Sequence, residues 1–177
     1  MEVIVTPRLI LRLLHERDVT LPYVRSLNDP KIVRLTEARH RKWTRNKVLQ
    51  YVRDGKSGKN YFLIGVFLKD DAKHIGNIRI FNVHPVHRRA ELGIMIFDTS
   101  SWGKGFGLEA LKAAVGFAFK DLKLHRVHAD YYALNIGSAK IFKRAGFKVE
   151  GLYKDHFYLE NKFVDSIRVA ILNKEVK

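Results

Sequence analysis

Three glycines at alternate positions mark the segment of this chain whose spacing best suits the binding of a ligand. They lie in Trp102-Gly103-Lys104-Gly105-Phe106-Gly107-Leu108-Glu109-Ala110, between a strongly apolar stretch and the most regular helical pattern in the sequence. Glycine lets a backbone turn tightly, and a helix N-terminus adds unpaired N–H groups and a partial positive charge. We expect a pyrophosphate site, and the competing interpretation is a glycine-rich helix entrance without a ligand.

Two better-known phosphate-binding motifs do not fit this chain. A dinucleotide fingerprint, G-x-G-x-x-G, would have Leu108 or Ala110 at its last position, and only the relaxed form accepts alanine. A P-loop, G-x-x-x-x-G-K-S/T, finds its tail at residues 55–57, but its first position is occupied by Gln50. We therefore expect neither a dinucleotide-binding unit nor a P-loop.

The predicted elements around the glycine turn are mostly strands, with helices between them along the chain. This order predicts a mixed sheet with helices on both faces. Apolar alternation or continuous apolar runs predict strands over residues 8–14, 61–68, 74–82, 88–97, 125–132, 147–158 and 163–172. Helical spacing predicts helices over residues 18–27, 45–54, 108–122 and 138–145. Asn28-Asp29-Pro30 is expected to end the first helix, and Gly55 and Gly58 the second.

Length and composition limit the class of protein. The 177 residues suffice for one domain over residues 1–177, and 46% of them are hydrophobic. The absence of cysteine excludes a disulfide framework, a thiolate zinc site and a cysteine nucleophile. Residues 1–12 lack the pattern of a signal peptide, and no stretch approaches 18 apolar residues. We expect a cytoplasmic protein that does not use a membrane.

The charge of the chain favours anionic partners. Its 33 Lys and Arg residues against 18 Asp and Glu residues give a formal net charge of +15. The excess is concentrated in residues 39–59, where Asp54 is the single acid. A solvated helix face explains such a run equally well. Charge alone does not distinguish a nucleic acid, an acidic membrane face and a phosphorylated small molecule.

Four segments in register resemble the GNAT superfamily of N-acetyltransferases, and within it the RimJ/RimL-like branch. The family's coenzyme A signature, Q/R-x-x-G-x-G/A, matches Trp102, Gly105 and Gly107, with tryptophan replacing the first residue. The other matching segments are Thr6-Pro7-Arg8-Leu9, Asn135-x-x-Ser138 with Ala145-Gly146-Phe147, and Glu150-Gly151 leading to His156. The resemblance implies a mixed α/β GNAT fold, a mostly antiparallel sheet of about seven strands with about four helices, and acetyl transfer from acetyl-CoA to a primary amine.

The resemblance also implies which residues bind the cofactor. The strand at Ile94, Met95 and Ile96 would pair with the pantetheine arm, and the N–H groups from Gly103 to Leu108 would hold the pyrophosphate. Asn135 would bond the pantetheine or polarise the thioester region, and the far side would be lined from the following helix. The full set is Ile94, Met95, Ile96, Trp102, Gly103, Lys104, Gly105, Phe106, Gly107, Leu108, Asn135, Ser138, Phe142 and Lys143.

The catalytic residues are less clearly marked. Attack of a neutral amine on a thioester needs proximity, a base for the ammonium proton and an acid for the leaving sulfur. Many family members have a tyrosine as the general acid at the position of Phe142, and phenylalanine has no proton to give. We therefore expect Ser138 to be the general acid; its alternative role is to cap the helix that starts there. Tyr131 and Tyr132 are alternative acids. A catalytically inactive sensor also remains open.

Two residues are candidates for the general base. Glu91 precedes the buried strand, near the expected acetyl position, and His156 has a suitable intrinsic pKa. An exposed charge or a structural hydrogen bond would explain either residue as well. His125 and His128 have poor spacing for a metal pair on a strand, so no metal site is expected.

The acceptor amine is expected to bind near Glu37, Arg39, His40 and Arg41, in the region that shapes this pocket in the family. This stretch and neighbouring segments resemble a subset of the branch associated with amino-sugar nucleotides, and a diphosphate would match the basic run. The rival acceptor is a protein N-terminus, such as that of a ribosomal protein. A non-catalytic nucleic-acid-binding module without coenzyme A affinity is the third alternative, against which no recognition-helix signature is found. A homodimer is left open by the sequence.

Overall fold

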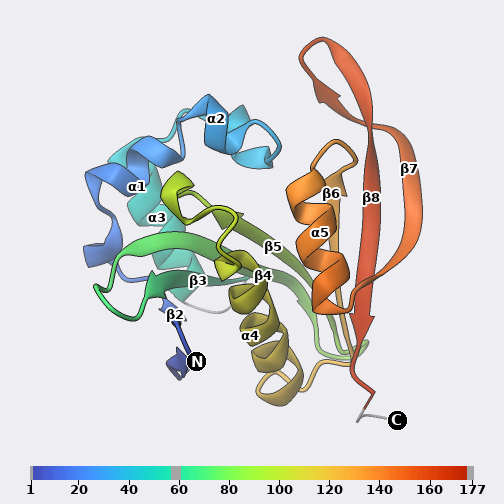
Figure 1. Ribbon diagram of the computed structural model, residues 1–177, viewed down its shortest axis with the longest axis horizontal. Helices are drawn as coiled ribbons and strands as arrows, with labels where there is room; N and C mark the ends of the chain where they lie inside the picture. The colour runs from blue at the N-terminus through green and yellow to red at the C-terminus, as the bar shows by residue number, and fades with distance from the viewer. Residues whose placement is uncertain (1, 57–60, 175–177) are drawn as a thin grey trace.

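The computed structural model describes residues 2–56 and 61–174, which form an eight-stranded sheet with helices on both faces (Figure 1). The spatial order of the strands is β1-β2-β3-β4-β5-β6-β8-β7. All neighbours pair antiparallel except β5 and β6, which are parallel. The strands are β1 (Ile4–Val5), β2 (Leu9–Leu13), β3 (Tyr61–Leu68), β4 (His74–His84), β5 (Arg89–Ile96), β6 (Arg126–Tyr132), β7 (Lys148–Leu159) and β8 (Lys162–Leu172).

The predicted mixed, mostly antiparallel sheet is confirmed, with one strand more than expected. The additional strand is β1, which has two residues and pairs with β2 through Ile4 opposite Leu11 and Val5 opposite Ile10. Two residues are too few to produce a detectable alternation of apolar and polar side chains. Its existence depends on the neighbouring strand rather than on its own pattern.

The described residues form five α-helices, where about four were expected. They are α1 (Leu21–Ser26), α2 (Pro30–Val33), α3 (Arg45–Lys56), α4 (Phe106–Lys120) and α5 (Ile136–Ala145), with short 3₁₀ turns η1 (Glu16–Asp18), η2 (Glu37–His40) and η3 (Thr99–Ser101). The additional helix is α2. Pro30 does follow the end of α1, but it also opens a new turn, which Asp29 caps by accepting from the Lys31 N–H at 2.9 Å. Helix α3 extends to Lys56, so the stop expected at Gly55 is wrong, and the one expected at Gly58 lies outside the described residues.

The sheet separates two hydrophobic cores. Figure 1 shows α4 and α5 in front of the sheet and α3 behind it. The larger core contains Leu111 and Ala114 of α4 with Leu92 of β5, and the second contains Val48 and Val52 of α3 with residues of α1 and β3. The apolar run at the end of β5 faces both cores, with Leu92 in one and Met95 packed against the other, but residues 93–96 are only half-buried.

None of the helices within residues 2–56 and 61–174 has the length and the continuous apolar character needed to span a membrane.

Candidate active site

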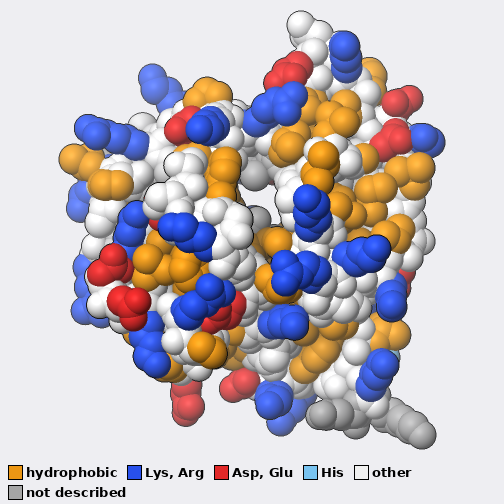
Figure 2. Space-filling view, viewed as in Figure 1, with side chains coloured by type: hydrophobic (Ala, Val, Ile, Leu, Met, Phe, Trp, Pro, Cys, Tyr) orange, Lys and Arg blue, Asp and Glu red, His pale blue; other side chains and the backbone are white. Residues whose placement is uncertain are grey.

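The two parallel strands in the middle of the sheet separate after a short contact. β5 and β6 pair only through Arg89–Arg126, Ala90–Val127 and Glu91–His128, although β5 continues to Ile96. The backbone of residues 92–96 therefore has no strand partner on its β6 side. Figure 2 shows the surface hollowed here, between the half of the molecule with α1 to α3 and the half with α5. We call this opening the β5–β6 slot; Ile94, Met95 and Ile96 lie along it.

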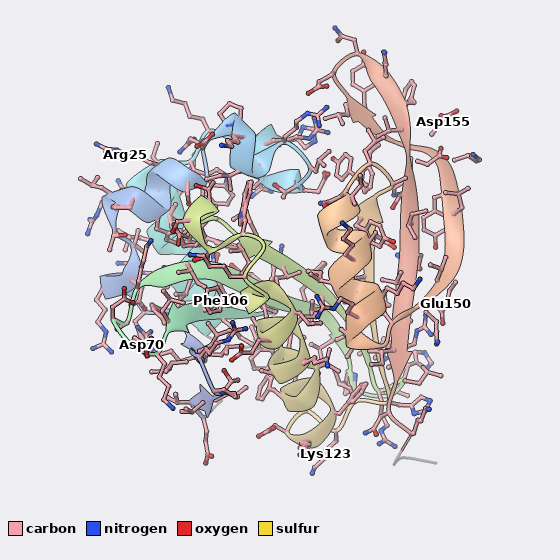
Figure 3. All side chains as sticks on the ribbon, in the orientation of Figure 1. Arg25, Asp70, Phe106, Lys123, Glu150 and Asp155 are labelled. Carbon is pink, nitrogen blue, oxygen red and sulfur yellow. The ribbon has the colours of Figure 1, made fainter. Side chains whose placement is uncertain are left out.

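The glycine turn leads directly into α4 at the end of this slot. Gly103 and Gly105 have φ angles of 76° and 84°, which L-residues with a side chain rarely adopt. The first helical bond runs from the Glu109 N–H to the Gly105 carbonyl at 3.1 Å, so the N–H groups of residues 106–108 have no acceptor within the helix. Phe106 marks this helix start near the centre of the molecule (Figure 3).

The geometry of this turn fits a diphosphate. Gly105 is the N-cap and has no side chain to satisfy the free N–H groups, and a Cβ on Gly103 would meet no atom within 4 Å. Free N–H groups at a helix N-terminus with open space in front of them form a site for an anion.

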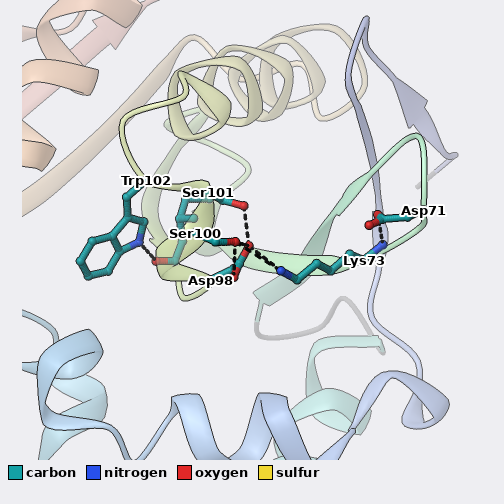
Figure 4. Close-up of polar contacts among 7 residues, drawn as sticks. Asp71, Lys73, Asp98, Ser100, Ser101 and Trp102 are labelled. Carbon is teal, nitrogen blue, oxygen red and sulfur yellow. Dashed lines mark hydrogen bonds and ion pairs between the residues drawn. The ribbon is translucent and has the colours of Figure 1, made fainter.

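Trp102 connects the turn to the end of β5 (Figure 4). Its indole Nε1 donates to the carbonyl oxygen of Ile96 at 2.7 Å. Between them, Asp98 accepts from the hydroxyls of Ser100 and Ser101 and from the ammonium of Lys73. Burial raises the pKa of Asp98, but these donors outweigh it and hold the pKa below its usual value. The tryptophan that departs from the family signature thus positions the turn relative to the slot.

The N-terminal segment holds the other side of the turn. Glu109 accepts from the Thr6 hydroxyl at 2.7 Å, from the Arg8 N–H at 2.9 Å and from the Arg8 Nε at 2.7 Å. Arg8 also donates from Nη1 to the Lys104 carbonyl at 3.0 Å, and its guanidinium lies 4.6 Å from the centre of the Phe106 ring. The matched segment at residues 6–9 therefore supports the turn through one carboxylate.

Replacing Glu109 with glutamine should weaken cofactor binding while leaving turnover nearly intact. The amide lacks the charge that holds Arg8, and a partly exposed charged hydrogen bond contributes on the order of 1 kcal/mol. We expect the KM for acetyl-CoA to rise roughly 3- to 10-fold with kcat within about twofold. Steady-state kinetics would measure this, with Asp121→Asn at the exposed far end of α4 as the matched control. Equal effects of the two substitutions would contradict the positioning role.

The fold and the site together define a class of protein: a mixed α/β sheet that opens beside a helix N-terminus prepared for a diphosphate. The family comparison then identifies the class by name. Residues 8–148 match the model described as "Acetyltransferase (GNAT) domain", and the chain belongs to this family. It is an acetyl-CoA-dependent N-acetyltransferase, so the resemblance to GNAT enzymes is confirmed.

Relatives and solved structures agree with this assignment. "Probable N-acetyltransferase YjcK" of Bacillus subtilis (strain 168) is 30% identical over 132 residues, which are 74% of this chain and 72% of that protein. A ribosomal-protein-S5-alanine acetyltransferase from Vibrio fischeri has a TM-score of 0.86 at 23% identity, with 100% of both chains covered. A spermidine N-acetyltransferase from Vibrio cholerae in complex with CoA and spermine has a TM-score of 0.84 at 21% identity, covering 94% of this chain and 96% of that one. The likeness to these structures shows the fold.

The far side of the slot begins at α5, and two expectations change there. Asn135 is the N-cap, and its Oδ1 accepts from the Ser138 N–H at 2.9 Å, so the capping role considered for Ser138 belongs to Asn135. The Ser138 hydroxyl makes no hydrogen bond with another described residue. Phe142 is only 3% exposed and packs against Tyr131 and Phe147. Because it belongs to the core, it offers a ligand almost no surface, whereas Lys143 is exposed.

The candidate acids and bases do not converge. Glu91 lies on the last paired rung of β5, where it accepts from Asn82 at 3.2 Å and lies 3.9 Å from His128. His156 is exposed on β7, against the rings of Tyr153 and Phe157. Glu91, His156 and Ser138 all lie within the part of the chain that the structure describes, and no hydrogen bond or ion pair joins any two of them.

The two tyrosines considered as alternative acids make different contacts. Tyr131 stacks on Phe142 with ring centres 5.7 Å apart. Tyr132 donates its hydroxyl proton to Glu37 at 2.6 Å, and burial and then this hydrogen bond raise the pKa of Tyr132 to about 12. The Tyr132 phenol is therefore engaged with Glu37, and Tyr131 stays an alternative acid.

The four residues expected at the acceptor lie on and just after η2. Glu37 binds Tyr132, and Arg39 donates to the Tyr132 hydroxyl at 3.0 Å and to the Tyr158 carbonyl at 2.6 Å. His40 is exposed and lies 3.6 Å from Glu37. Two of the four, Glu37 and Arg41, line a cavity of about 450 Å³ between this region and the sheet. Arg39 and His40 do not line it.

We call this space the β4–β5 cavity. It lies against the slot, because Ile94 and Met95 line it as well. Its other walls include residues that the sequence analysis missed, namely Tyr23, Tyr51, Asn77, Arg79 and Gly93. A signal was available for two of them: Asn77 and Arg79 are polar residues at alternate positions in a strand that also contains Ile75, Ile78 and Ile80.

Proposed function

We propose that this N-acetyltransferase acts on the primary amine of a small anionic acceptor, such as a nucleotide-linked amino sugar, that enters the β4–β5 cavity. The observation that supports this most directly is the environment of the Arg79 side chain, which is surrounded by aromatic rings. Its guanidinium lies 4.3 Å from the ring centre of Tyr61, 4.6 Å from that of Phe81 and 5.7 Å from that of Tyr51.

None of the ion pairs among the described residues involves the Arg79 guanidinium, and its Nε is buried without a hydrogen-bond partner there. Arg41 adds a second positive charge to the cavity wall, which also carries the carboxylates of Glu37 and Asp54. A guanidinium held between aromatic rings is suited to a carboxylate or phosphate.

We assign the general base to Glu91 and the general acid to Ser138. Glu91 is on the same face of β5 as Gly93, and strand geometry places their Cα atoms about 7 Å apart. Ser138 lies in the first turn of α5, across the slot, with its hydroxyl free of partners among the described residues. Bound acetyl-CoA supplies the thioester. Glu91 would take the ammonium proton, and Ser138 would supply one toward the sulfur.

A panel of amines tests the acceptor class. The panel contains a nucleotide-linked amino sugar, an uncharged amino sugar, spermidine and an N-terminal peptide of a ribosomal protein, and thiol release measures turnover. We expect the anionic amine to show a kcat/KM roughly 10- to 100-fold above the uncharged one, because a charge-assisted hydrogen bond is worth about 1.5–3 kcal/mol. Arg79→Met keeps the length and the aromatic contacts but should abolish this preference.

The same panel distinguishes the rivals. Faster turnover of the peptide or of spermidine, or a preference for the anion that survives in Arg79→Met, would contradict the proposed acceptor class. Lys174→Met, an exposed change of one positive charge in the C-terminal segment, serves as the control for a general effect of net charge. It should leave the preference unchanged.

A further inference from the structure

Tyr23 is among the residues that line the β4–β5 cavity, and its hydroxyl is the one polar group of its side chain. Its side chain is 1% exposed and packs against Phe97 and His74, with ring centres 5.3 and 5.0 Å away. Burial is the main reason why the pKa of Tyr23 is strongly raised. The phenol therefore keeps its proton at neutral pH, and the direction of that proton matters.

The direction is set by a chain of hydrogen bonds that starts at His74. The Nε2 atom of this ring lies 3.1 Å from the Gly76 carbonyl oxygen and 2.8 Å from Oδ1 of Asn77. Both neighbours are oxygen acceptors, so Nε2 must bear the proton. Burial lowers the pKa of His74, and Nδ1 has no partner among the described residues, which agrees with a neutral ring protonated at Nε2 alone.

The proton on His74 fixes the next two groups. Oδ1 of Asn77 accepts from it, so Nδ2 faces the Tyr23 hydroxyl, to which it donates at 2.7 Å. A reversed amide would place its NH₂ group against the N–H of His74. The Tyr23 oxygen is consequently an acceptor within the protein. No hydrogen bond from the hydroxyl to another described residue is found, and Tyr23 and Asn77 both line the cavity.

We infer that Tyr23 is a specificity-determining residue whose hydroxyl donates to an oxygen of the acceptor's anionic group, and that His74 and Asn77 are positioning residues that aim it. The inference rests on the proposed function. Asn77 and Arg79 lie on the same face of β4, opposite Met95 and Gly93 of β5. A carboxylate or phosphate in front of this face can accept from the Arg79 guanidinium and the Tyr23 hydroxyl together.

Two single variants and their combination test the direction of the proton. Tyr23→Phe removes the donor, and we expect the KM for the best amine of the panel, and the inhibition constant of inorganic phosphate, to rise about 10-fold. Asn77→Asp keeps the size, but the introduced carboxylate accepts from both His74 and Tyr23 and turns the phenolic proton away from the cavity. Its effect should be similar. The KM of the double variant should be no higher than that of the more strongly impaired single variant, because both substitutions remove the same interaction.

Tyr158→Phe is the control. It removes the hydroxyl of an exposed tyrosine of β7 that packs against Phe163 and does not line the β4–β5 cavity, so the KM for the amine should stay within about twofold. The KM for acetyl-CoA should also be unchanged in every variant, which shows that the fold and the cofactor site are intact.

Two results would overturn the inference. One is an unchanged KM for the amine in Tyr23→Phe. The other is an Asn77→Asp effect that is as large in the Tyr23→Phe background as in the wild type, since that effect would come from charge repulsion. Failure of the proposed function is recognised separately. If the best amine of the panel is not anionic, the acceptor class is wrong whatever Tyr23 does.

Discussion

Replacing Gly105 with glutamate is expected to lower the affinity for acetyl-CoA by at least about 100-fold. Gly105 has a φ of 84°, and a side chain in that conformation costs about 1–2 kcal/mol. The new carboxylate would also stand at the N-terminus of α4, where the free N–H groups of residues 106–108 must meet the negative phosphates. Strain and like-charge repulsion act in the same direction, and about 1.4 kcal/mol corresponds to each factor of ten.

Calorimetry with acetyl-CoA measures this loss, and two further variants separate its causes. Gly105→Ala introduces the strain without the charge and should lie between wild type and Gly105→Glu. Gly116→Glu introduces the same charge further along α4, where an added Cβ would meet no atom within 4 Å, and should bind nearly as wild type does. Unchanged affinity in Gly105→Glu would mean that the turn does not hold the pyrophosphate.

The structural elements around the glycine turn that were predicted correctly have local causes. Glycines at 103, 105 and 107 followed by a regular apolar spacing indicate a tight turn and a helix, and the structure has both. The strand before them is recognised by its apolar run, because it faces both cores. Order along the chain also predicted a sheet with helices on both faces. Each of these inferences needs only residues within about one element of each other.

The parts that were missed depend on contacts between distant residues. Glu109 bonds Thr6 across 103 positions, and Asn77 bonds Tyr23 across 54, so neither pair produces a pattern in the sequence. The helix cap shows the same limit at short range. Asn135 and Ser138 are both good capping residues, and only the backbone geometry decides that Asn135 is the cap. Chemical type therefore predicted the candidates, and the fold decided among them.

The catalytic candidates illustrate why residue type is a weak guide to a general base. His156 has the better intrinsic pKa, but β7 places it on an exposed surface among aromatic rings. Glu91 is an ordinary carboxylate by sequence, yet it lies where β5 and β6 separate. In choosing a general base, the position of the side chain relative to the slot is a stronger criterion than its pKa, because a base must reach the proton that it removes.

Replacing Gly93 with leucine is expected to lower kcat/KM for the amine by more than about 100-fold while acetyl-CoA affinity stays within about threefold. Gly93 lines the β4–β5 cavity opposite Arg79, and an added Cβ would meet no atom within 4 Å. Its backbone is outside the left-handed region, so a side chain is not strained there. A leucine would therefore occupy the space in which the acceptor must lie, and displacement of a reacting group by about 1 Å can already cost 100-fold.

Graded substitutions at Gly93 connect this loss to volume. Gly93→Ala should reduce kcat/KM for the amine only modestly, and Gly116→Leu, which also extends into open space but on α4, should leave it unchanged. Steady-state kinetics with the amine and calorimetry with acetyl-CoA report the two ligands independently. If Gly93→Leu weakens both to the same extent, the side chain obstructs the β5–β6 slot itself. In that case the acceptor reaches the thioester from another side, and Arg79 and Tyr23 lose their assigned roles together.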